Sequence, residues 1–76
     1  MVRKMKKITI NTEYITLGQF LKFADIISNG GEAKSYLACN EVYINDELDV
    51  RRGRKLRHGD KVLVEGQEFI IENENQ

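Results

Sequence analysis

Helix-start and turn signals follow one another so closely along this 76-residue chain that none of its helices or strands can be long. Thr16, with Gln19 three positions later, has the pattern of a capping box and predicts the start of a helix. Asn29 opens a second helix, and together with Gly30 and Gly31 it interrupts the first. Short elements of this kind bury their apolar faces only against one another, which favours a single small domain.

The apolar residues that follow Thr16 recur at helical spacing and form one apolar face. They predict a first helix that continues to the Asn29 interruption, with a buried side made of Leu17, Phe20, Leu21, Ala24 and Ile27. Ile15, directly before the cap, can pack against Phe20 as a hydrophobic staple. Burial of each large side chain on this face stabilises the fold by roughly 1.5–3 kcal/mol before the loss of chain entropy is subtracted.

The second helix is expected to be short and to run to about Cys39. Ala33, Tyr36 and Leu37 supply its buried side, with the Tyr36 hydroxyl at the surface. Asn40 is expected to stop the helix, because asparagine tolerates the left-handed backbone that ends many helices. Cys39, near that end, is interpreted as a small buried hydrophobe.

Short strands account for most of the remaining chain. Alternating apolar and polar residues predict a strand at 6–12 before the helices, and strands at 41–44, 47–48, 61–64 and 67–72 after them. Turns are expected at Asn45-Asp46, at Gly59-Asp60 and at Gly66. The predicted fold class is α+β, with two short helices packed on a small, mainly antiparallel sheet.

The charges of the chain are equal in number but unevenly placed. The 12 basic and 12 acidic residues cancel, which at first argues against a nucleic-acid partner. However, residues 1–7 carry four basic and no acidic residues, whereas residues 65–76 carry four acidic and no basic residues. Residues 51–61 carry six basic residues and a single Asp. This segregation lets the chain present a basic surface despite a net charge of zero.

The rest of the composition narrows the class of protein. With one cysteine and one histidine, the chain can form neither an internal disulfide nor a clustered zinc site, so we expect no metal or cofactor and a reduced, cytoplasmic setting. No apolar run is long enough to span a membrane. An enzyme is not expected, because nucleophile and paired-acid motifs are absent and His58 is predicted in an exposed turn. A monomer is the default for a small chain without a large apolar surface.

Four groups of residues occur in an order and spacing that are characteristic of a known family. They are Phe20-Leu21, Glu32-Ala33-Lys34, Val42-Tyr43-Ile44-Asn45 and Leu56-Arg57-His58-Gly59-Asp60-Lys61-Val62. Over residues 17–64 the chain resembles the RNA-binding domain of ribosomal protein S-four, a two-helix-plus-hairpin unit called the alpha-L motif. Segments 30–34 and 51–56 look like those of the small stand-alone members called YaaA and YbcJ. The resemblance implies binding to structured RNA, with ribosomal RNA or a ribosome-assembly intermediate as the expected target.

Five cations within seven positions, grouped around Gly53, form the main candidate RNA-binding site. They are Arg51, Arg52, Arg54, Lys55 and Arg57, and we expect them on a loop beside the hairpin. Each arginine can donate two N–H groups to phosphate oxygens, and each neutralised phosphate releases counterions. The alternative is a solvated loop whose charges balance Glu47 and Asp49. The block of like charge favours a partner, because such blocks repel internally.

Five further residues extend this predicted site: Lys22, Gly30, Gly31, Lys34 and Tyr43. Gly30 and Gly31 either leave N–H groups at the second helix open to a phosphate beside Lys34, or simply let the chain turn sharply. Lys22, on the polar side of the first helix, extends the surface or is an ordinary exposed lysine. Of the three tyrosines, Tyr43 is the best candidate to stack on an unpaired base.

The expected organisation is a basic N-terminal arm at 1–7, one RNA-binding domain at 8–72 and an acidic, polar tail at 73–76. The predicted function is non-enzymatic docking on structured RNA, such as ribosomal RNA or a ribosomal subunit, through the basic loop and a helix N-terminus. Two alternatives stay open from the sequence: a protein-binding adaptor of similar α+β shape, and a DNA-binding accessory protein.

Overall fold

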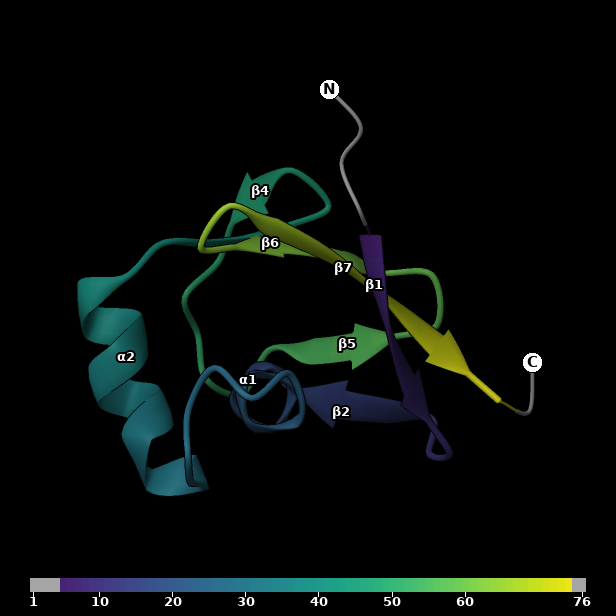
Figure 1. Ribbon diagram of the computed structural model, residues 1–76, viewed down its shortest axis with the longest axis horizontal. Helices are drawn as coiled ribbons and strands as arrows, with labels where there is room; N and C mark the ends of the chain where they lie inside the picture. The colour runs from purple at the N-terminus through teal and green to yellow at the C-terminus, as the bar shows by residue number, and fades with distance from the viewer. Residues whose placement is uncertain (1–4, 75–76) are drawn as a thin grey trace.

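Short strands and two short helices make up residues 5–74, the part of the chain that the computed structural model describes. In chain order the elements are β1 (Met5–Ile10), β2 (Tyr14–Thr16), α1 (Leu17–Phe23), the 3-10 turn η1 (Gly30–Glu32), α2 (Ala33–Cys39), β3 (Val42–Ile44), β4 (Glu47–Leu48), β5 (Lys55–Arg57), β6 (Lys61–Val64) and β7 (Gln67–Asn73) (Figure 1). Within residues 5–74, neither helix has the length and apolar character needed to cross a membrane.

Two layers form the fold. One is a five-stranded sheet in the order β1-β7-β6-β3-β4, in which β1 runs parallel to β7 and the other pairs are antiparallel. The other layer contains α1 and a two-stranded antiparallel sheet of β2 and β5 (Figure 1). The predicted α+β class with a mainly antiparallel sheet is confirmed, whereas the β2–β5 pair was not predicted.

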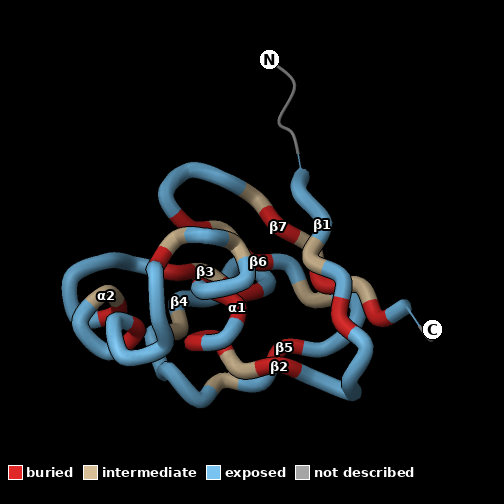
Figure 2. Tube along the Cα trace, turned by 60° about the horizontal axis from the view of Figure 1, so that its bottom comes forward, coloured by how far each residue is buried: buried red, intermediate tan, exposed pale blue. Residues whose placement is uncertain are grey.

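The core lies between the two layers (Figure 2). Every second residue of the central strands faces inward, and the buried set there is Val42, Ile44, Val62, Val64, Phe69 and Ile71. The fully buried ring of Phe20, in α1, meets Phe69 edge-on with 5.1 Å between ring centroids. Ile15 and Leu56 pair across β2 and β5 and are buried from the second layer. Because Val42 and Ile44 of β3 face inward, Tyr43 between them stands on the outer face of the sheet, away from α1.

α1 begins as its sequence predicts. The Thr16 hydroxyl accepts a hydrogen bond from the Gln19 N–H at 3.3 Å, and the Gln19 side chain accepts one from the Thr16 N–H at 2.9 Å. This reciprocal pair confirms the capping box. Ile15 and Phe20, the predicted staple, are both buried in the core.

α1 ends earlier than its apolar spacing indicates. The helix stops at Phe23, because Asp25 takes a left-handed φ of 62°. The Ile26 N–H then donates to the Leu21 carbonyl at 2.9 Å, which is the bond that closes a Schellman motif. The predicted continuation to residue 29 is therefore wrong, although Ile27 is buried as expected from the segment that follows.

Replacing Asp25 with glycine is expected to stabilise the protein. Glycine adopts a left-handed backbone without the Cβ clash that aspartate meets, so Asp25→Gly should raise the free energy of unfolding by about 0.5 kcal/mol. Asp25→Ala keeps the Cβ and loses the polar side chain, and it should lower the same quantity by about 1 kcal/mol. Urea unfolding followed by circular dichroism measures both. A glycine variant less stable than the alanine variant would contradict this explanation of the helix end.

The second helical segment starts as predicted and stops by a different means. The Asn29 side chain accepts from the Gly31 N–H at 3.0 Å and begins the 3-10 turn that leads into α2. Asn40 has extended backbone, with φ of −132°, and its side chain donates to the Tyr36 carbonyl at 2.9 Å. The predicted left-handed conformation of Asn40 is wrong, because a side-chain hydrogen bond caps the helix instead.

Two side chains of α2 differ in exposure from their predicted state. The Tyr36 hydroxyl is buried rather than at the surface. Its burial, with the Glu65 carboxylate nearby, raises the pKa of Tyr36 to about 12. Cys39 is exposed rather than buried, because α2 turns only Ala33 and Leu37 fully into the core.

The predicted hairpin turns are confirmed by their backbone conformation. Asn45 and Asp46 have φ values of 52° and 70°, and β4 returns antiparallel to β3 after them. Glu65 and Gly66, at 52° and 73°, join β6 to β7 in the same way. Such left-handed pairs match the twist of the strands on either side.

Strand structure extends into the predicted arm at one end and reaches the first residue of the predicted tail at the other. β1 begins at Met5, so Lys7 belongs to a strand, and its ammonium group lies 3.5 Å from the Glu72 carboxylate. Asn73 belongs to β7, donates its side-chain amide to the Thr12 carbonyl at 2.8 Å and is buried. Residues 1–4 of the predicted arm and 75–76 of the predicted tail lie outside the described residues.

Candidate nucleic-acid interface

The five predicted cations lie on two kinds of local structure, and we call them the basic cluster: Arg51, Arg52, Arg54, Lys55 and Arg57. Residues 51–54 form a turn, closed by the Arg54 N–H, which donates to the Arg51 carbonyl at 3.0 Å. Lys55 and Arg57 belong to β5, where they alternate with the buried Leu56 and stand on the exposed face. The predicted loop position is therefore wrong for these last two residues.

The turn of the basic cluster is anchored by its main chain to the start of α1. The first N–H groups of a helix have no partner within the helix. Here the Leu17 N–H donates to the Arg54 carbonyl at 2.7 Å, and the Gly18 N–H donates to the Arg52 carbonyl at 3.0 Å. The cations are therefore carried on a fixed backbone, and their side chains are not needed to hold it.

Gly18 makes this close approach possible. A Cβ at this position would lie 3.1 Å from Arg52 Cγ and 3.4 Å from the Cβ of Ala33. A side chain at position 18 would therefore require the Arg52 side chain to move by a few tenths of an ångström and would fill the space between α1 and Ala33 of α2.

The anchored turn forms one wall of a surface hollow of about 340 Å³, which we call the basic hollow. It brings together three predicted site residues from three separate segments, Lys22, Gly30 and Arg52. The remaining lining residues are Thr16, Gly18, Gln19 and Gly53. Two cations beside an uncovered glycine backbone suit a phosphate group.

Asp49 organises one side of the basic cluster. Its carboxylate accepts from the Arg51 side chain at 3.0 Å and 2.8 Å and lies 3.2 Å from Arg54 Nε. The hydrogen bonds from Arg51, joined by the charge of Arg54, lower the pKa of Asp49 to about 2 from its ordinary 3.8. Within residues 5–74, no acidic side chain forms an ion pair with Arg52, Lys55 or Arg57.

The Asp49 ion pairs are expected to add stability that is lost in acid. Because the folded-state pKa is depressed to about 2, this contribution is complete above about pH 4 and disappears as the pH falls toward 2. Asp49→Asn should therefore lower the free energy of unfolding by roughly 0.5–1 kcal/mol at neutral pH, as partly exposed pairs do. Urea unfolding of both proteins across this range measures the difference. A difference that did not shrink in acid would contradict this assignment.

Tyr14 is a contact of the basic cluster that the sequence did not indicate. It lies opposite Arg57 in the β2–β5 pair. The Lys55 ammonium group lies 5.0 Å from the centre of the Tyr14 ring, and the Arg57 guanidinium carbon lies 5.5 Å from it. Both distances are within the range of cation–π attraction. This contact was not predicted because β2 itself was not predicted: its three residues are too few to show an alternating pattern.

The structure does not gather the other predicted site residues at the basic hollow. The Gly31 N–H is already used by the Asn29 side chain, and Lys34 is exposed in the first turn of α2. Tyr43 lies on the outer face of the five-stranded sheet, where a hydrogen bond to the Glu41 carboxylate raises its pKa. The part of these residues in RNA binding stays a prediction. The geometry favours the turn at 51–54, β5 and α1 as the elements that form the binding site.

Comparison with known proteins gives the same family as the sequence pattern. Residues 8–72 match the S4 domain family. A protein of Bacillus subtilis (strain 168), described as "Probable ribosome maturation protein RlbA", is 63% identical over 59 residues, which cover 78% of this chain and 83% of that protein. No solved structure gives a significant match.

Proposed function

The chain belongs to the S4 domain family, and on that basis we propose that it is a non-enzymatic RNA-binding protein that docks on structured RNA through the basic cluster. The observation that carries the proposal is the anchoring of the turn to α1 through the Arg52 and Arg54 carbonyls. It presents the cations from a rigid backbone, so less conformational entropy is lost when they bind a partner.

Phosphate contacts are the proposed mode of binding. Arg52 and Lys22 flank the basic hollow, while Lys55 and Arg57 stand on the adjoining face of β5. Cations placed in this way can contact successive phosphates of an RNA backbone. The positions of these phosphates depend on the shape of the RNA, so such contacts recognise shape. Arg51 and Arg54 are held in place by Asp49, which fixes their direction and partly offsets their charge.

Ribosomal RNA, or a precursor in ribosome assembly, is the proposed target. The Bacillus subtilis relative is described as a probable ribosome maturation protein, and the match covers most of this chain. Structured RNA has A-form helices, single-stranded loops and 2′-hydroxyls that a DNA duplex lacks, so the proposal also predicts a preference for RNA over DNA.

A competition assay tests the choice of nucleic acid. Labelled fragments of ribosomal RNA are bound to the protein and then displaced by an unlabelled RNA hairpin or by a DNA hairpin of the same sequence. The RNA hairpin should compete at much lower concentration, because A-form geometry and the 2′-hydroxyls are available only in RNA. Equal competition would favour a DNA-binding accessory protein. Failure to bind the labelled RNA at all would contradict the proposal and favour a protein-binding adaptor.

A further inference from the structure

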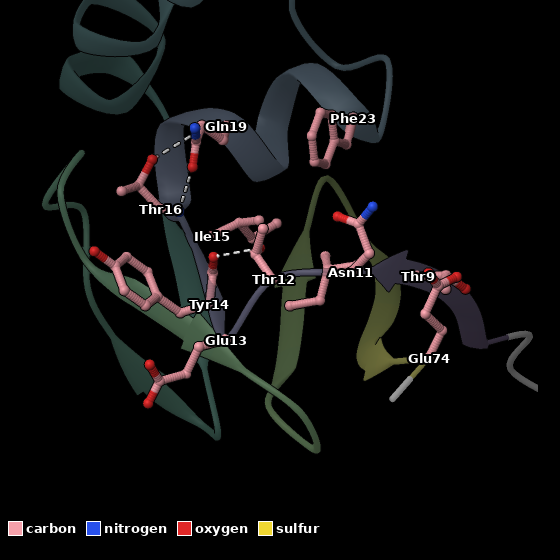
Figure 3. A pocket seen from close by; sticks show the side chains of 11 residues that line it. Thr9, Asn11, Thr12, Glu13, Tyr14, Ile15, Thr16, Gln19, Phe23 and Glu74 are labelled. Atoms are coloured by element: carbon pink, nitrogen blue, oxygen red, sulfur yellow. Dashed lines mark hydrogen bonds between the residues drawn. The ribbon is translucent and has the colours of Figure 1, made fainter. Parts of the chain in front are cut away.

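A surface hollow of about 680 Å³ lies outside the basic cluster. We call it the aromatic hollow. It is bounded by residues 9–16 on one side and by Gln19 and Phe23 of α1 on the other, and Figure 3 shows these side chains around the open space. None of the residues predicted to bind RNA lines it, so the function described above leaves it unused.

Two aromatic rings and an amide give this hollow its chemical character. Phe23 is 57% exposed and Tyr14 is 38% exposed, and both line the hollow. In Figure 3 the Phe23 ring projects from α1 toward the Asn11 side chain. Within the described part of the chain, no hydrogen bond engages the Asn11 amide, which can both donate and accept. Exposed rings beside a free amide suit a flat, polar ring system.

The aromatic hollow is continuous with the basic cluster. Tyr14 lines the hollow while Lys55 and Arg57 lie over its ring, so the aromatic wall of one site carries the cations of the other. Thr16 and Gln19 line both the aromatic hollow and the basic hollow. A polymer whose charged groups bind the cations therefore passes along the edge of the aromatic hollow.

The charges within the hollow decide which part of such a polymer enters it. Glu13 and Glu74 belong to its lining, and basic side chains do not. Carboxylates repel a phosphate but accept hydrogen bonds from the exocyclic amino groups of adenine, guanine and cytosine. A nucleobase is therefore favoured over a phosphate as the occupant, and stacking on aromatic rings is the usual way in which proteins hold an unpaired base.

We propose that the aromatic hollow binds one unpaired, amino-bearing nucleobase of the RNA whose phosphates lie on the basic cluster, with Phe23 as the stacking surface and Tyr14 on the side toward the cations. This inference rests on the proposed RNA-binding function and adds a base-specific contact to it. It also transfers the predicted stacking role from Tyr43, on the outer face of the sheet, to Phe23.

The test compares three short RNA hairpins that differ at one position: a bulged adenosine, an abasic ribose in the bulge, and no bulge. Fluorescence anisotropy gives the affinity of each for the wild type, for Phe23→Ser and for the control Leu48→Ser. Leu48 is a matched control, because it is 55% exposed and lies in β4 outside both hollows. Phe23 is a cleaner target than Tyr14, since replacing Tyr14 would also release Lys55 and Arg57.

The wild type should bind the bulged adenosine roughly tenfold more tightly than the abasic bulge, which is the usual effect of one stacked base. Phe23→Ser should lose most of this preference and keep its affinity for the abasic hairpin, while Leu48→Ser should behave as the wild type. Equal wild-type affinity for the adenosine and abasic hairpins, with salt-dependent binding of both, would overturn this inference and leave the proposed function standing. No binding of any hairpin would overturn both.

Discussion

Phe20→Ala is expected to lower the free energy of unfolding by about 3–5 kcal/mol, the range for removing a fully buried aromatic side chain. Phe20 is fully buried and is the point where α1 meets Phe69 of the sheet. A domain of this size has a total stability on the order of 5 kcal/mol, so the variant should keep only about 0–2 kcal/mol, and up to roughly half of it should be unfolded without denaturant. Far-ultraviolet circular dichroism in a urea series measures the loss.

Phe23→Ala is the matched control for this prediction. It removes the same side chain from the same helix, but Phe23 is 57% exposed. Its free energy of unfolding should stay within about 0.5 kcal/mol of the wild type, as is usual at exposed positions. Similar losses in the two variants would mean that α1 is not packed against the sheet through Phe20.

The second large effect concerns salt. If about five phosphates are neutralised by the basic cluster, raising the salt from about 50 to 200 mM should weaken RNA binding roughly a hundredfold. A triple variant, with Arg52, Lys55 and Arg57 changed to Ala, keeps two of the cations and should lose less than about tenfold over the same range. Anisotropy titrations at several salt concentrations give the two slopes.

The triple variant is chosen because it should fold normally. Within the described residues its three side chains have no ion pair to lose, and the carbonyls that anchor the turn to α1 belong to the main chain. Lys61→Ala is the control, since Lys61 is an exposed cation at the start of β6, outside the basic hollow. An unchanged salt slope in the triple variant, or an equal change in the control, would place the RNA elsewhere on the protein.

Local signals in the sequence were sufficient for most of the fold. The Thr16 capping box and the Asn45-Asp46 turn both depend on neighbouring residues, and both were predicted correctly. The end of α1 was missed, because the apolar spacing continues past Asp25 although the backbone does not. The β2–β5 pair was missed for a different reason: its strands have three residues each and meet only through tertiary contact.

In the candidate site, too, local features were predicted from the sequence and tertiary contacts were not. The cations of the basic cluster were visible as a block of like charge, but their anchoring to Leu17 and Gly18 depends on a contact between distant segments. The pairing of Asp49 with Arg51 and Arg54 was anticipated only as general charge balance. The position of Tyr14 beside the cations could not be predicted without the β2–β5 register.

The most direct test of RNA docking is sedimentation of the protein from a native cell lysate on a sucrose gradient, with and without ribonuclease. The wild type should migrate with a ribosomal subunit or an assembly precursor, and ribonuclease should release it to the top of the gradient. The triple variant at Arg52, Lys55 and Arg57 should remain at the top without ribonuclease, while Lys61→Ala should migrate as the wild type. Wild-type protein that stays at the top under both conditions, or co-migration that survives the triple substitution, would contradict the proposed docking through the basic cluster.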